Sequence, residues 1–427
     1  MAKSDTRPHV ILIGGCGFRS GVPEHIRHIV KAMKDHACIT IVSEPDRGGY
    51  TEARALGAVH HSIQGLSSGL SPQRHIQAGR KLLRFLKGQP ADLVWVHARL
   101  AVLICRIALM LRIWRPTHPV LFTFHGLPFG RGHRTVLRRC AAIVERCILR
   151  FSPQLKLVFL SDQMRDSMIS HLGIPIAGRH RFHVLTNCSD LGELTPTKRK
   201  SGFNIVMTGR ACYQKDYDTA VRVFSALPDR FTLTLAGMNT QTPHFQQRIR
   251  ARVPNATFER ITFCGPVRDV RPLLGAADAF MLTSRYEGMP IGALEAFEMG
   301  LPLILKDFDG ARELASNHPF ALVTPFRDLA SDCDRIAELL ADYQKHVPTN
   351  RAAVQHAWAQ SFSPPVFQRN LHQLFEDCGV SLCAIEAASD CTRDDPVRHQ
   401  YRDKRSAFLA PTPPPCCTDG APSARSE

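Results

Sequence analysis

Two glutamates eight residues apart mark the stretch of this sequence with the clearest chemistry. Glu287 and Glu295 belong to the segment SRYEGMPIGALEA, residues 284–296, which follows an apolar run at Ala279–Leu282. A proline such as Pro290 is well suited to begin a helix. The N–H groups at a helix start can hold phosphate, and a carboxylate one turn further on can accept hydrogen bonds from sugar hydroxyls. The alternative is a solvated helix face, but the residues around Glu295 are apolar and small. The N–H groups near Ile291–Ala293 could then hold phosphate, and we expect Met289, Pro290 and Ile291 to contact the bound ligand.

A second loop carries two cations. Arg210 and Lys215 lie five residues apart in the segment GRACYQKD, residues 209–216, between a strand-like run and a predicted helix at Tyr217–Leu227. Two cations on a loop that opens a helix can clamp a diphosphate. Taken alone, an ordinary basic loop is the simpler interpretation.

A glycine cluster lies near the beginning of the chain, also between a strand and a helix. Gly14, Gly15, Gly17 and Gly21 leave room for a ligand to approach the backbone. We expect Gly15 and Gly17 to contact such a ligand, and a tight turn is the alternative. The spacing departs from the dinucleotide-binding pattern G-x-G-x-x-G. A nicotinamide-dependent oxidoreductase would use this loop, but it would leave the two later segments unexplained.

The elements that must position these residues alternate between strands and helices. Such alternation predicts parallel sheets covered on both faces, with ligands at the carboxyl ends of the strands. We expect two α/β domains in series, at 1–193 and 203–350, followed by helices at 351–380 that return to the first domain. The segment 194–202 is typical of a linker, and 389–427 of a disordered tail. The predicted strands are His9–Ile13, Cys38–Val42, Asp92–Val96, Val120–Phe124, Lys156–Leu160, His183–Leu185, Asn204–Met207, Thr232–Leu235, Ile261–Phe263, Ala279–Leu282, Leu303–Leu305 and Ala321–Val323.

The positive charge is concentrated in the first half. Residues 1–195 carry 27 Lys and Arg against 12 Asp and Glu, and the remainder carries 27 against 26. A basic half is typical of a protein with an anionic partner, and a solvated basic surface that keeps the protein soluble is the alternative. Because no nucleic-acid-binding motif accompanies the charge, we expect an anionic membrane surface and no nucleic acid.

One predicted helix, which begins at Thr135, could form the membrane contact. Arg139, Arg146 and Arg150 share one face of it. The apolar residues could face either the core or lipid. They are Leu137, Ile143, Val144, Ile148 and Leu149.

The segment 284–296 resembles the E-x7-E signature of the large family of retaining GT-B glycosyltransferases, the glycosyl transferases group 1 type. Other pieces follow in that family's order, with similarity over about residues 9–375. Phe124-His125-Gly126 is similar to the family's strand-end histidine, and the segment GRACYQKD to its G-R-x-x-x-Q-K-D loop. Further similar segments are Gly14–Gly21, Thr186–Asp190 and Asp309–Glu313.

The resemblance implies a GT-B fold, in which two Rossmann-like parallel-sheet domains face a cleft. It also implies roles for single residues. Arg210 and Lys215 would bind the diphosphate of a nucleotide-sugar donor, and Glu287 would face the transferred sugar. Glu295 would hold the ribose, and His125 would approach the reacting centre.

The implied activity is sugar transfer to a glycan or lipid-linked acceptor with retention of configuration, in cell-surface polysaccharide synthesis. A nucleotide-sugar epimerase of the same architecture is an alternative. We expect no cofactor and no metal. The D-x-D pattern of Asp307-Phe308-Asp309 can hold a metal in other proteins. Here we expect this segment to be the passage from a strand into a loop. We expect a cytoplasmic protein that is peripheral on the inner face of the membrane.

Overall fold

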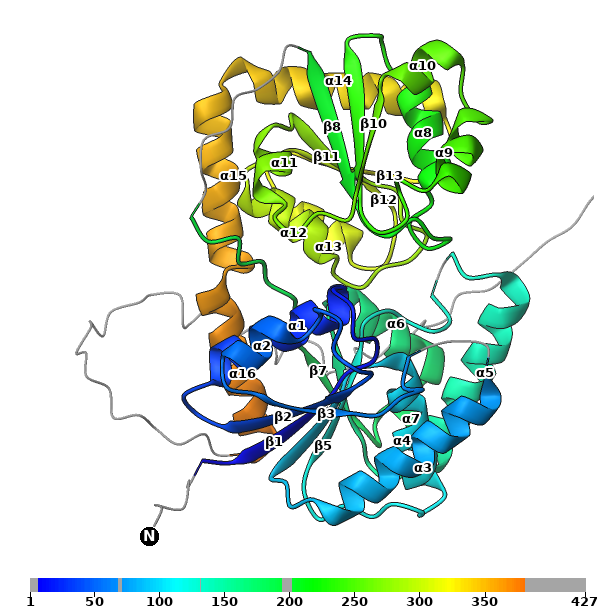
Figure 1. Cartoon of the computed structure of the whole chain (residues 1–427), viewed down its shortest axis with the longest axis vertical. Helices are drawn as coiled ribbons and strands as arrows, with labels where there is room; N and C mark the ends of the chain where they lie inside the picture. The colour runs from blue at the N-terminus through cyan, green and yellow to red at the C-terminus, as the bar shows by residue number, and fades with distance from the viewer. Residues whose placement is uncertain (1–6, 68–70, 131, 194–201, 381–427) are drawn as a thin grey trace, which may run out of the picture. The chain divides into compact units, whose positions relative to one another are not determined.

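Two parallel sheets organise the chain. The computed structural model describes residues 7–67, 71–130, 132–193 and 202–380 (Figure 1). The predicted linker at 194–202, apart from Gly202, and the predicted tail at 389–427 lie outside the described residues.

The first sheet has seven parallel strands in the order β3-β2-β1-β4-β5-β6-β7. The order reverses between β1 and β4, so the loops after these two strands open a crevice at the carboxyl edge. Val10 pairs with Leu93 and Ile13 with Val96. The strands are β1 (His9–Ile13), β2 (Cys38–Ser43), β3 (Val59–Ser62), β4 (Leu93–Val96), β5 (Val120–Phe124), β6 (Lys156–Phe159) and β7 (Arg181–Val184).

The second sheet has six parallel strands in the order β10-β9-β8-β11-β12-β13. Its order reverses between β8 and β11, where Ala279 pairs with Ile205. The loops after β8 and β11 therefore meet at one edge. The strands are β8 (Phe203–Thr208), β9 (Phe231–Ala236), β10 (Ile261–Gly265), β11 (Ala279–Leu282), β12 (Leu303–Lys306) and β13 (Ala321–Thr324).

The predicted strands are confirmed, with small shifts at their ends. The sequence missed β3, whose residues Val-His-His-Ser form no apolar run because the strand lies at the exposed edge of the sheet. Burial on both faces gives the central strands their continuous apolar sequences. Leu93–Val96, for example, is fully buried.

Helices connect the strands and cover the sheets. In the first half they are α1 (Gly21–Met33), α2 (Thr51–Ala55), α3 (Pro72–Gly88), α4 (Arg99–Met110), α5 (Thr135–Phe151), α6 (Asp162–Leu172) and α7 (Ile174–Ala177). In the second half they are α8 (Tyr217–Ala226), α9 (Pro243–Arg250), α10 (Asn255–Glu259), α11 (Arg271–Gly275), α12 (Ile291–Glu298), α13 (Ala311–Ser316), α14 (Leu329–Lys345), α15 (Val347–Ser361) and α16 (Pro364–Asp377).

The last two helices contact both halves of the fold. Helix α15 packs against α12, and α16 packs against α1 (Figure 1). Phe367, Leu371 and Phe375 of α16 are buried in the same cluster as Val10 and Trp95 of the first sheet. Burying an aromatic or leucine side chain contributes about 1.5–3 kcal/mol, so α16 is an integral part of the first half.

The glycine loop after β1 is packed tightly against its own fold. A side chain at Gly17 would overlap the carbonyl oxygen of Pro45, and a Cβ at Gly15 would lie 3.0 Å from that of Ala98. The carbonyl of Gly17 accepts hydrogen bonds from the N–H groups of Arg47 and Gly49. Close approach of two loops is therefore sufficient to explain a glycine at position 17.

We predict that Gly17→Ala destabilises the protein by about 1–3 kcal/mol, because the added methyl group must displace a hydrogen-bonded loop. Gly21→Ala is the matched control, since a Cβ at Gly21 meets nothing within 4 Å. Urea unfolding of both variants measures the difference. Equal midpoints for the two variants would contradict this account of the loop.

Candidate functional site

The two charged loops of the second half meet, as the strand order requires. Lys215, on the loop after β8, points to Glu287, on the loop after β11, with 2.8 Å between Nζ and Oε1. The exposed fraction of the side chain is 19% for Lys215 and 11% for Glu287. A cation and a carboxylate thus share a largely dry position at the carboxyl edge of the sheet.

A buried carboxylate holds the two loops in this arrangement. Asp216 is 4% exposed, and its Oδ1 and Oδ2 accept from Arg285 at 2.5 Å and Lys306 at 2.7 Å. The backbone of Asp216 has a left-handed φ of 52°. The hydroxyl of Thr283 donates to the carbonyls of Lys215 and Asp216. Residues from β12 and the β11 loop therefore fix the backbone beside Lys215.

Arg210 stands at the other end of the β8 loop. Its side chain is exposed, and within the described parts of the chain it forms no hydrogen bond or ion pair. Of the two predicted cations, Lys215 forms an ion pair with Glu287 and Arg210 is exposed to solvent. Arg210 can accept an anion without first breaking an internal contact.

The start of α12 supplies backbone groups. Pro290 occupies the N-cap position, and its carbonyl accepts from Ala293 and Leu294. The N–H groups of a first helical turn have no partner within the helix, so Ile291 begins a turn suited to an anion. The Met289 side chain is 2% exposed, which makes it a packing residue. Its carbonyl accepts from Nδ2 of Asn187 at 2.6 Å.

Glu295, one turn into α12, is half-buried, and it forms no ion pair with any of the residues that the structure describes. Burial raises its pKa to about 8, and the negative charges of Glu24 and Glu298 add to this effect. The carboxyl is therefore mainly protonated at pH 7. A protonated carboxyl can both donate and accept a hydrogen bond, as a pair of neighbouring hydroxyls requires.

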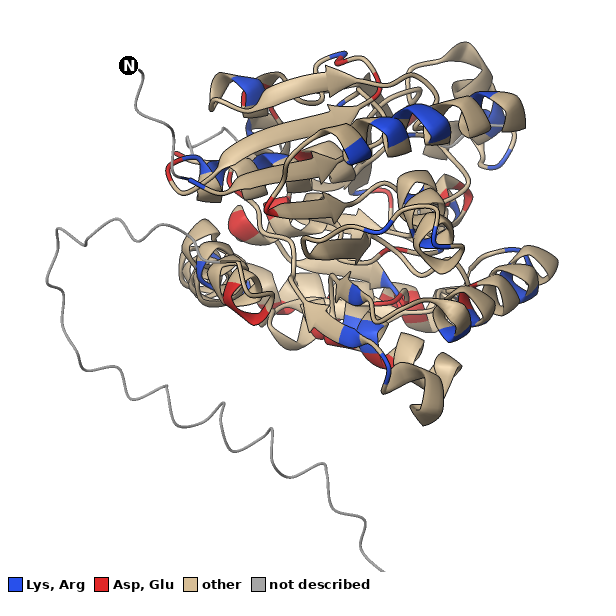
Figure 2. Ribbon diagram, turned by 90° about the horizontal axis from the view of Figure 1, so that it is seen from below, with Lys and Arg blue, Asp and Glu red and all other residues tan. Residues whose placement is uncertain are grey.

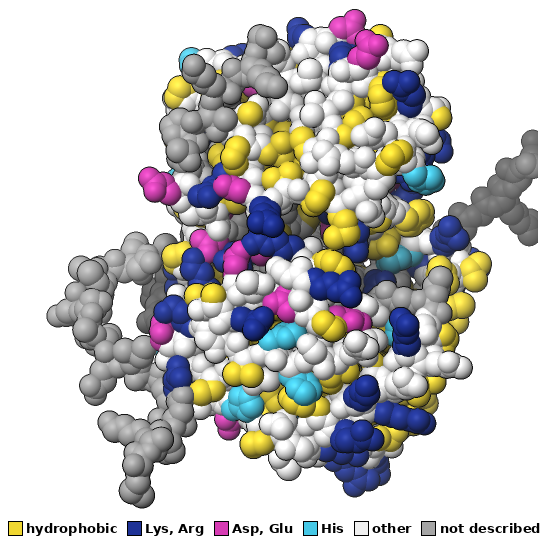
Figure 3. Space-filling model, in the orientation of Figure 1, with side chains coloured by type: hydrophobic (Ala, Val, Ile, Leu, Met, Phe, Trp, Pro, Cys, Tyr) yellow, Lys and Arg dark blue, Asp and Glu magenta, His cyan; other side chains and the backbone are white. Residues whose placement is uncertain are grey.

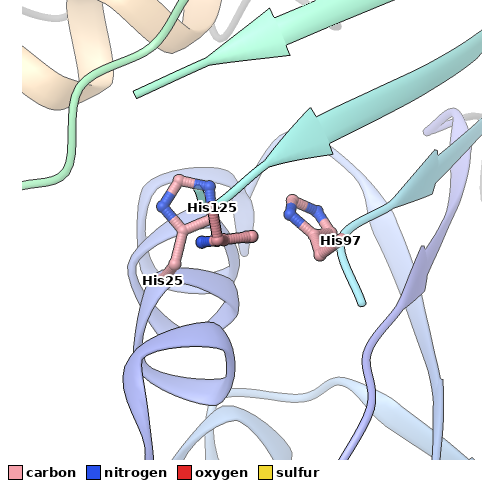
Figure 4. A group of neighbouring side chains, drawn as sticks. All are labelled: His25, His97 and His125. Carbon is pink, nitrogen blue, oxygen red and sulfur yellow. The ribbon is translucent and has the colours of Figure 1, made fainter. Parts of the chain in front are cut away.

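His125 lies directly after β5, in a group of three imidazoles. Its ring centroid is 5.0 Å from that of His25 and 5.7 Å from that of His97 (Figure 4). Burial lowers the pKa of His125 to about 4. Burial and the neighbouring imidazoles hold the pKa values of His25 and His97 well below the usual value. All three rings are therefore neutral at pH 7.

His25 and His97 were missed by the sequence prediction. His97 follows strand β4 and His25 lies on α1, so the chain separates them by 72 positions. The one available signal was that His97 and His125 each come directly after a buried strand. Neighbouring parallel strands end at the same edge of a sheet, which would have placed these two residues close together.

His125 also lies close to the Glu287 loop. A Cβ at Gly288 would come within 2.9 Å of the His125 carbonyl oxygen. A side chain at Gly310, whose φ is 87°, would overlap the carbonyl of Gly288. These close backbone approaches bring the predicted residues His125 and Glu287 to one place. In the D-x-D segment, the carboxylate of Asp307 forms an ion pair with the guanidinium of Arg312 at 3.0 Å.

The pKa of Glu295 leads to a prediction about stability. Its carboxyl binds a proton in the folded state below about pH 8 but in the unfolded state only below about 4.5. This group stabilises the fold fully below pH 4.5, and the contribution is lost as pH rises to 8. Relative to wild type, Glu295→Gln should therefore gain stability as pH rises from about 4.5 to about 8, by up to about 1.4 kcal/mol per pH unit.

The measurement is urea unfolding of wild type and variant at several pH values. Glu338→Gln, an exposed change on α14, is the matched control and should give a constant difference from wild type. A constant difference for Glu295→Gln as well would show that Glu295 is ionised across this range.

The sequence matches two family models in tandem. The model described as Glycosyltransferase Family 4 matches residues 19–193, and the model described as Glycosyl transferases group 1 matches residues 202–342. The boundary between them coincides with the passage from the first sheet to the second.

Two curated relatives are enzymes of sugar transfer. One is the UDP-Gal:alpha-D-GlcNAc-diphosphoundecaprenol alpha-1,3-galactosyltransferase of Escherichia coli, 24% identical over 61% of this chain and 69% of the relative. Another is the glycogen synthase of Mycobacterium tuberculosis, 28% identical over 56% of this chain. That second alignment spans 58% of the relative's length.

Solved structures share the fold. Sucrose-phosphate synthase from Thermosynechococcus elongatus superposes with a TM-score of 0.70 at 17% identity, over 87% of this chain and 99% of that one. Anabaena HepE in complex with UDP-glucose superposes with a TM-score of 0.68 at 16% identity, over 87% of this chain and 100% of that one. The predicted GT-B fold is confirmed, and with the two family models in tandem the chain belongs to the group 1 type of GT-B glycosyltransferases.

Proposed function

We propose that this glycosyltransferase moves a sugar from a nucleotide-sugar donor to a lipid-linked glycan acceptor, with retention of configuration, in cell-surface polysaccharide synthesis. The observation that carries the proposal is the Lys215–Glu287 pair, which joins the loop that carries the exposed Arg210 to the loop that leads into α12. The acceptor class is supported by the E. coli relative, whose name specifies a diphosphoundecaprenol-linked sugar.

The charges fit the bond that must break. Cleavage of a sugar–diphosphate bond leaves negative charge on the phosphate, which preorganised cations stabilise in the transition state. Arg210 supplies one cation without reorganisation. Lys215 turns from Glu287 to the diphosphate when the donor binds. The reaction then needs neither a cofactor nor a divalent metal on the diphosphate.

Glu287, released from Lys215, faces the transferred sugar. The sugar ring gains positive charge as the leaving group departs, and a carboxylate close to it stabilises that charge. His125 contributes a neutral imidazole near the same position, and Glu295 binds the ribose hydroxyls. Gly15 and Gly17 form the wall of the site on the side of the first sheet. Attack of the acceptor from the leaving-group side then retains the configuration.

The oxidoreductase alternative is poorly supported by the first sheet. In dinucleotide-binding folds an acidic residue after the second strand binds the ribose. Here Glu44 is the candidate, and its Oε1 accepts from the N–H groups of Gly65 and Ser67 and from the Ser67 hydroxyl. The carboxylate is thus committed to an internal loop. An epimerase remains distinguishable by experiment, because it turns over the donor without an acceptor.

We predict that Glu287→Gln lowers kcat about a hundredfold, because the variant keeps the size of the side chain and loses the charge. Arg210→Ala should mainly weaken donor binding. The assay combines a panel of nucleotide sugars with a diphosphoundecaprenol-linked sugar, without added Mg²⁺ or Mn²⁺, and NMR reports the anomeric configuration of the product.

Glu338→Gln is the matched control for this assay and should retain wild-type turnover. Near-normal kcat in Glu287→Gln would remove the proposed role of the carboxylate. Product formation that depends on added Mg²⁺ would instead remove the metal-free diphosphate site. Donor conversion without acceptor would favour the epimerase.

The acceptor class implies contact with a membrane, and helix α5 has the required surface. In the described part of the chain, no helix is both long and apolar enough to cross a bilayer. Apolar side chains of α5 nevertheless face solvent, whereas Ile148 and Leu149 on the same helix are buried. Of the five apolar residues named from the sequence, two therefore face the core and three face solvent. The exposed stripe consists of Val136, Leu137, Cys140, Ile143, Val144, Cys147 and Phe151.

Basic residues flank this stripe. Arg139, Arg146 and Arg150 are exposed and lie on one side of the apolar stripe around the helix. Hydrophobic and basic side chains gather along the edge where α5 lies (Figure 3), and Lys and Arg recur along several helices (Figure 2). An apolar stripe beside arginines is typical of a helix that lies in an anionic membrane interface. The protein is then a peripheral protein on the cytoplasmic face.

We predict that the protein binds vesicles rich in anionic lipid and that changing Arg139, Arg146 and Arg150 to Glu weakens binding at least tenfold. Each arginine near an anionic surface contributes about 1 kcal/mol. Co-sedimentation at low and high salt is the measurement. The double variant Ile143→Ser, Val144→Ser tests insertion separately from charge.

The matched control reverses three exposed charges on α3, namely Arg80, Arg84 and Lys87, which lack a comparable apolar stripe. Equal loss of binding in the two triple variants would indicate a diffuse charge effect without a docking helix. A wild-type protein that stays in the supernatant with strongly anionic vesicles at low salt would exclude membrane docking and favour a soluble acceptor.

A further inference from the structure

The three imidazoles at the carboxyl edge of the first sheet leave several buried nitrogens without a hydrogen-bond partner. His25 and His97 are 0% and 1% exposed. Within the described parts of the chain, Nε2 of His25, Nε2 of His125 and both ring nitrogens of His97 have none. A buried polar atom without a partner costs about 1–3 kcal/mol. Four such atoms in one place indicate a ligand that the described residues do not supply.

The tautomer of His25 can be derived from its neighbour. Asn187 donates its Nδ2 to the carbonyl of Met289, so its Oδ1 is the acceptor that faces Nδ1 of His25 at 2.7 Å. Nδ1 of His25 must therefore carry the proton. In a neutral ring this leaves a lone pair on Nε2, and that nitrogen is one of the four without a partner.

The three side chains converge from different elements. His25 comes from α1, His97 from the end of β4 and His125 from the end of β5 (Figure 4). One ring nitrogen from each lies within 4.8 Å of the other two. Three nitrogens around a tetrahedral Zn²⁺ lie roughly 3.3 Å apart, given Zn–N bonds of about 2.0–2.1 Å. Small side-chain rotations would close this difference.

We propose that His25, His97 and His125 bind one Zn²⁺ ion through a ring nitrogen of each. Neutral imidazole is a preferred ligand of this ion. Asn187 acts as a positioning residue, because metal-bound histidines usually donate their second ring N–H to an oxygen acceptor. His125 is the least buried of the three. The fourth coordination position therefore opens on its side, where water or a hydroxyl completes the shell.

This zinc site shares no residue with the proposed metal-free diphosphate site, although His125 is also the imidazole proposed to lie near the transferred sugar. Zinc binding itself does not depend on the identity of donor or acceptor. The sequence-based expectation of no metal considered the D-x-D segment at 307–309. It did not consider these histidines. Trp95 and Phe367 form aromatic walls around His25, so the ion would lie in surroundings from which water is largely excluded.

The test uses the full chain without a polyhistidine tag. The protein is equilibrated with Zn²⁺, desalted, and analysed by elemental mass spectrometry. We expect about one ion per chain in wild type and at least a tenfold lower affinity in His97→Gln. His118→Gln is the matched control. His118 is also half-buried with an unpartnered Nε2, but it lies at the opposite end of β5.

Substitution by Co²⁺ distinguishes this site from the free cysteines of the chain. Nitrogen ligands give visible d–d bands without the sulfur-to-cobalt charge-transfer band of a thiolate site. Zn²⁺ should also raise the Tm of wild type and not that of His97→Gln. If His97→Gln does not fold, His125→Gln, at the most exposed ligand, takes its place.

Three results would overturn the proposal. They are a zinc content far below one ion per wild-type chain, equal zinc retention in wild type and the ligand variants, and a cobalt spectrum dominated by thiolate bands. None of them bears on sugar transfer, which the assay above measures independently.

Discussion

The buried carboxylate of Asp216 is the constraint on which the donor side of the structure depends. It forms ion pairs with Arg285 and Lys306, which reach it from different segments, and so joins the loop after β8 to the loop after β11. Removal of one member of a buried ion pair typically costs about 3–5 kcal/mol. The arrangement leaves Lys215, the residue before Asp216 in the chain, with Glu287 as its partner. The functional charges are thus positioned by structural ones.

Burial divides the ionisable groups of the site into two kinds. Lys215 and Glu287 compensate each other and remain an ion pair in a largely dry place. Glu295 has no such partner, so burial keeps it protonated, and burial likewise keeps His125 neutral. The proposed function requires both kinds of group, because a diphosphate and sugar hydroxyls would have to bind at one site. In the proposed reaction Lys215 of the charged pair binds the diphosphate, and the neutral groups form hydrogen bonds with hydroxyls.

Sequence patterns predicted much of this arrangement because its key residues follow buried strands. Lys215 and Glu287 could be placed together from the strand alternation and the family's motifs. Their ion pair could not be predicted, because it depends on how two loops fold against Asp216. His25 lies on a helix and is part of no recognisable sequence motif. The strand order β1-β4-β5 brings it beside His97 and His125. Strand β3 was missed because an exposed edge strand needs no apolar run.

Helix α5 shows why periodicity alone left the membrane question open. Its sequence has enough apolar residues for two faces, and the structure assigns Ile148 and Leu149 to the core while Leu137, Ile143 and Val144 stay in solvent. The exposed stripe does not contribute to the core, and it lies beside three arginines that would repel another basic protein. Sheet packing requires only one apolar face of a helix. The proposed membrane docking would account for the second face, because the surface of a membrane with anionic lipids is apolar and anionic at once.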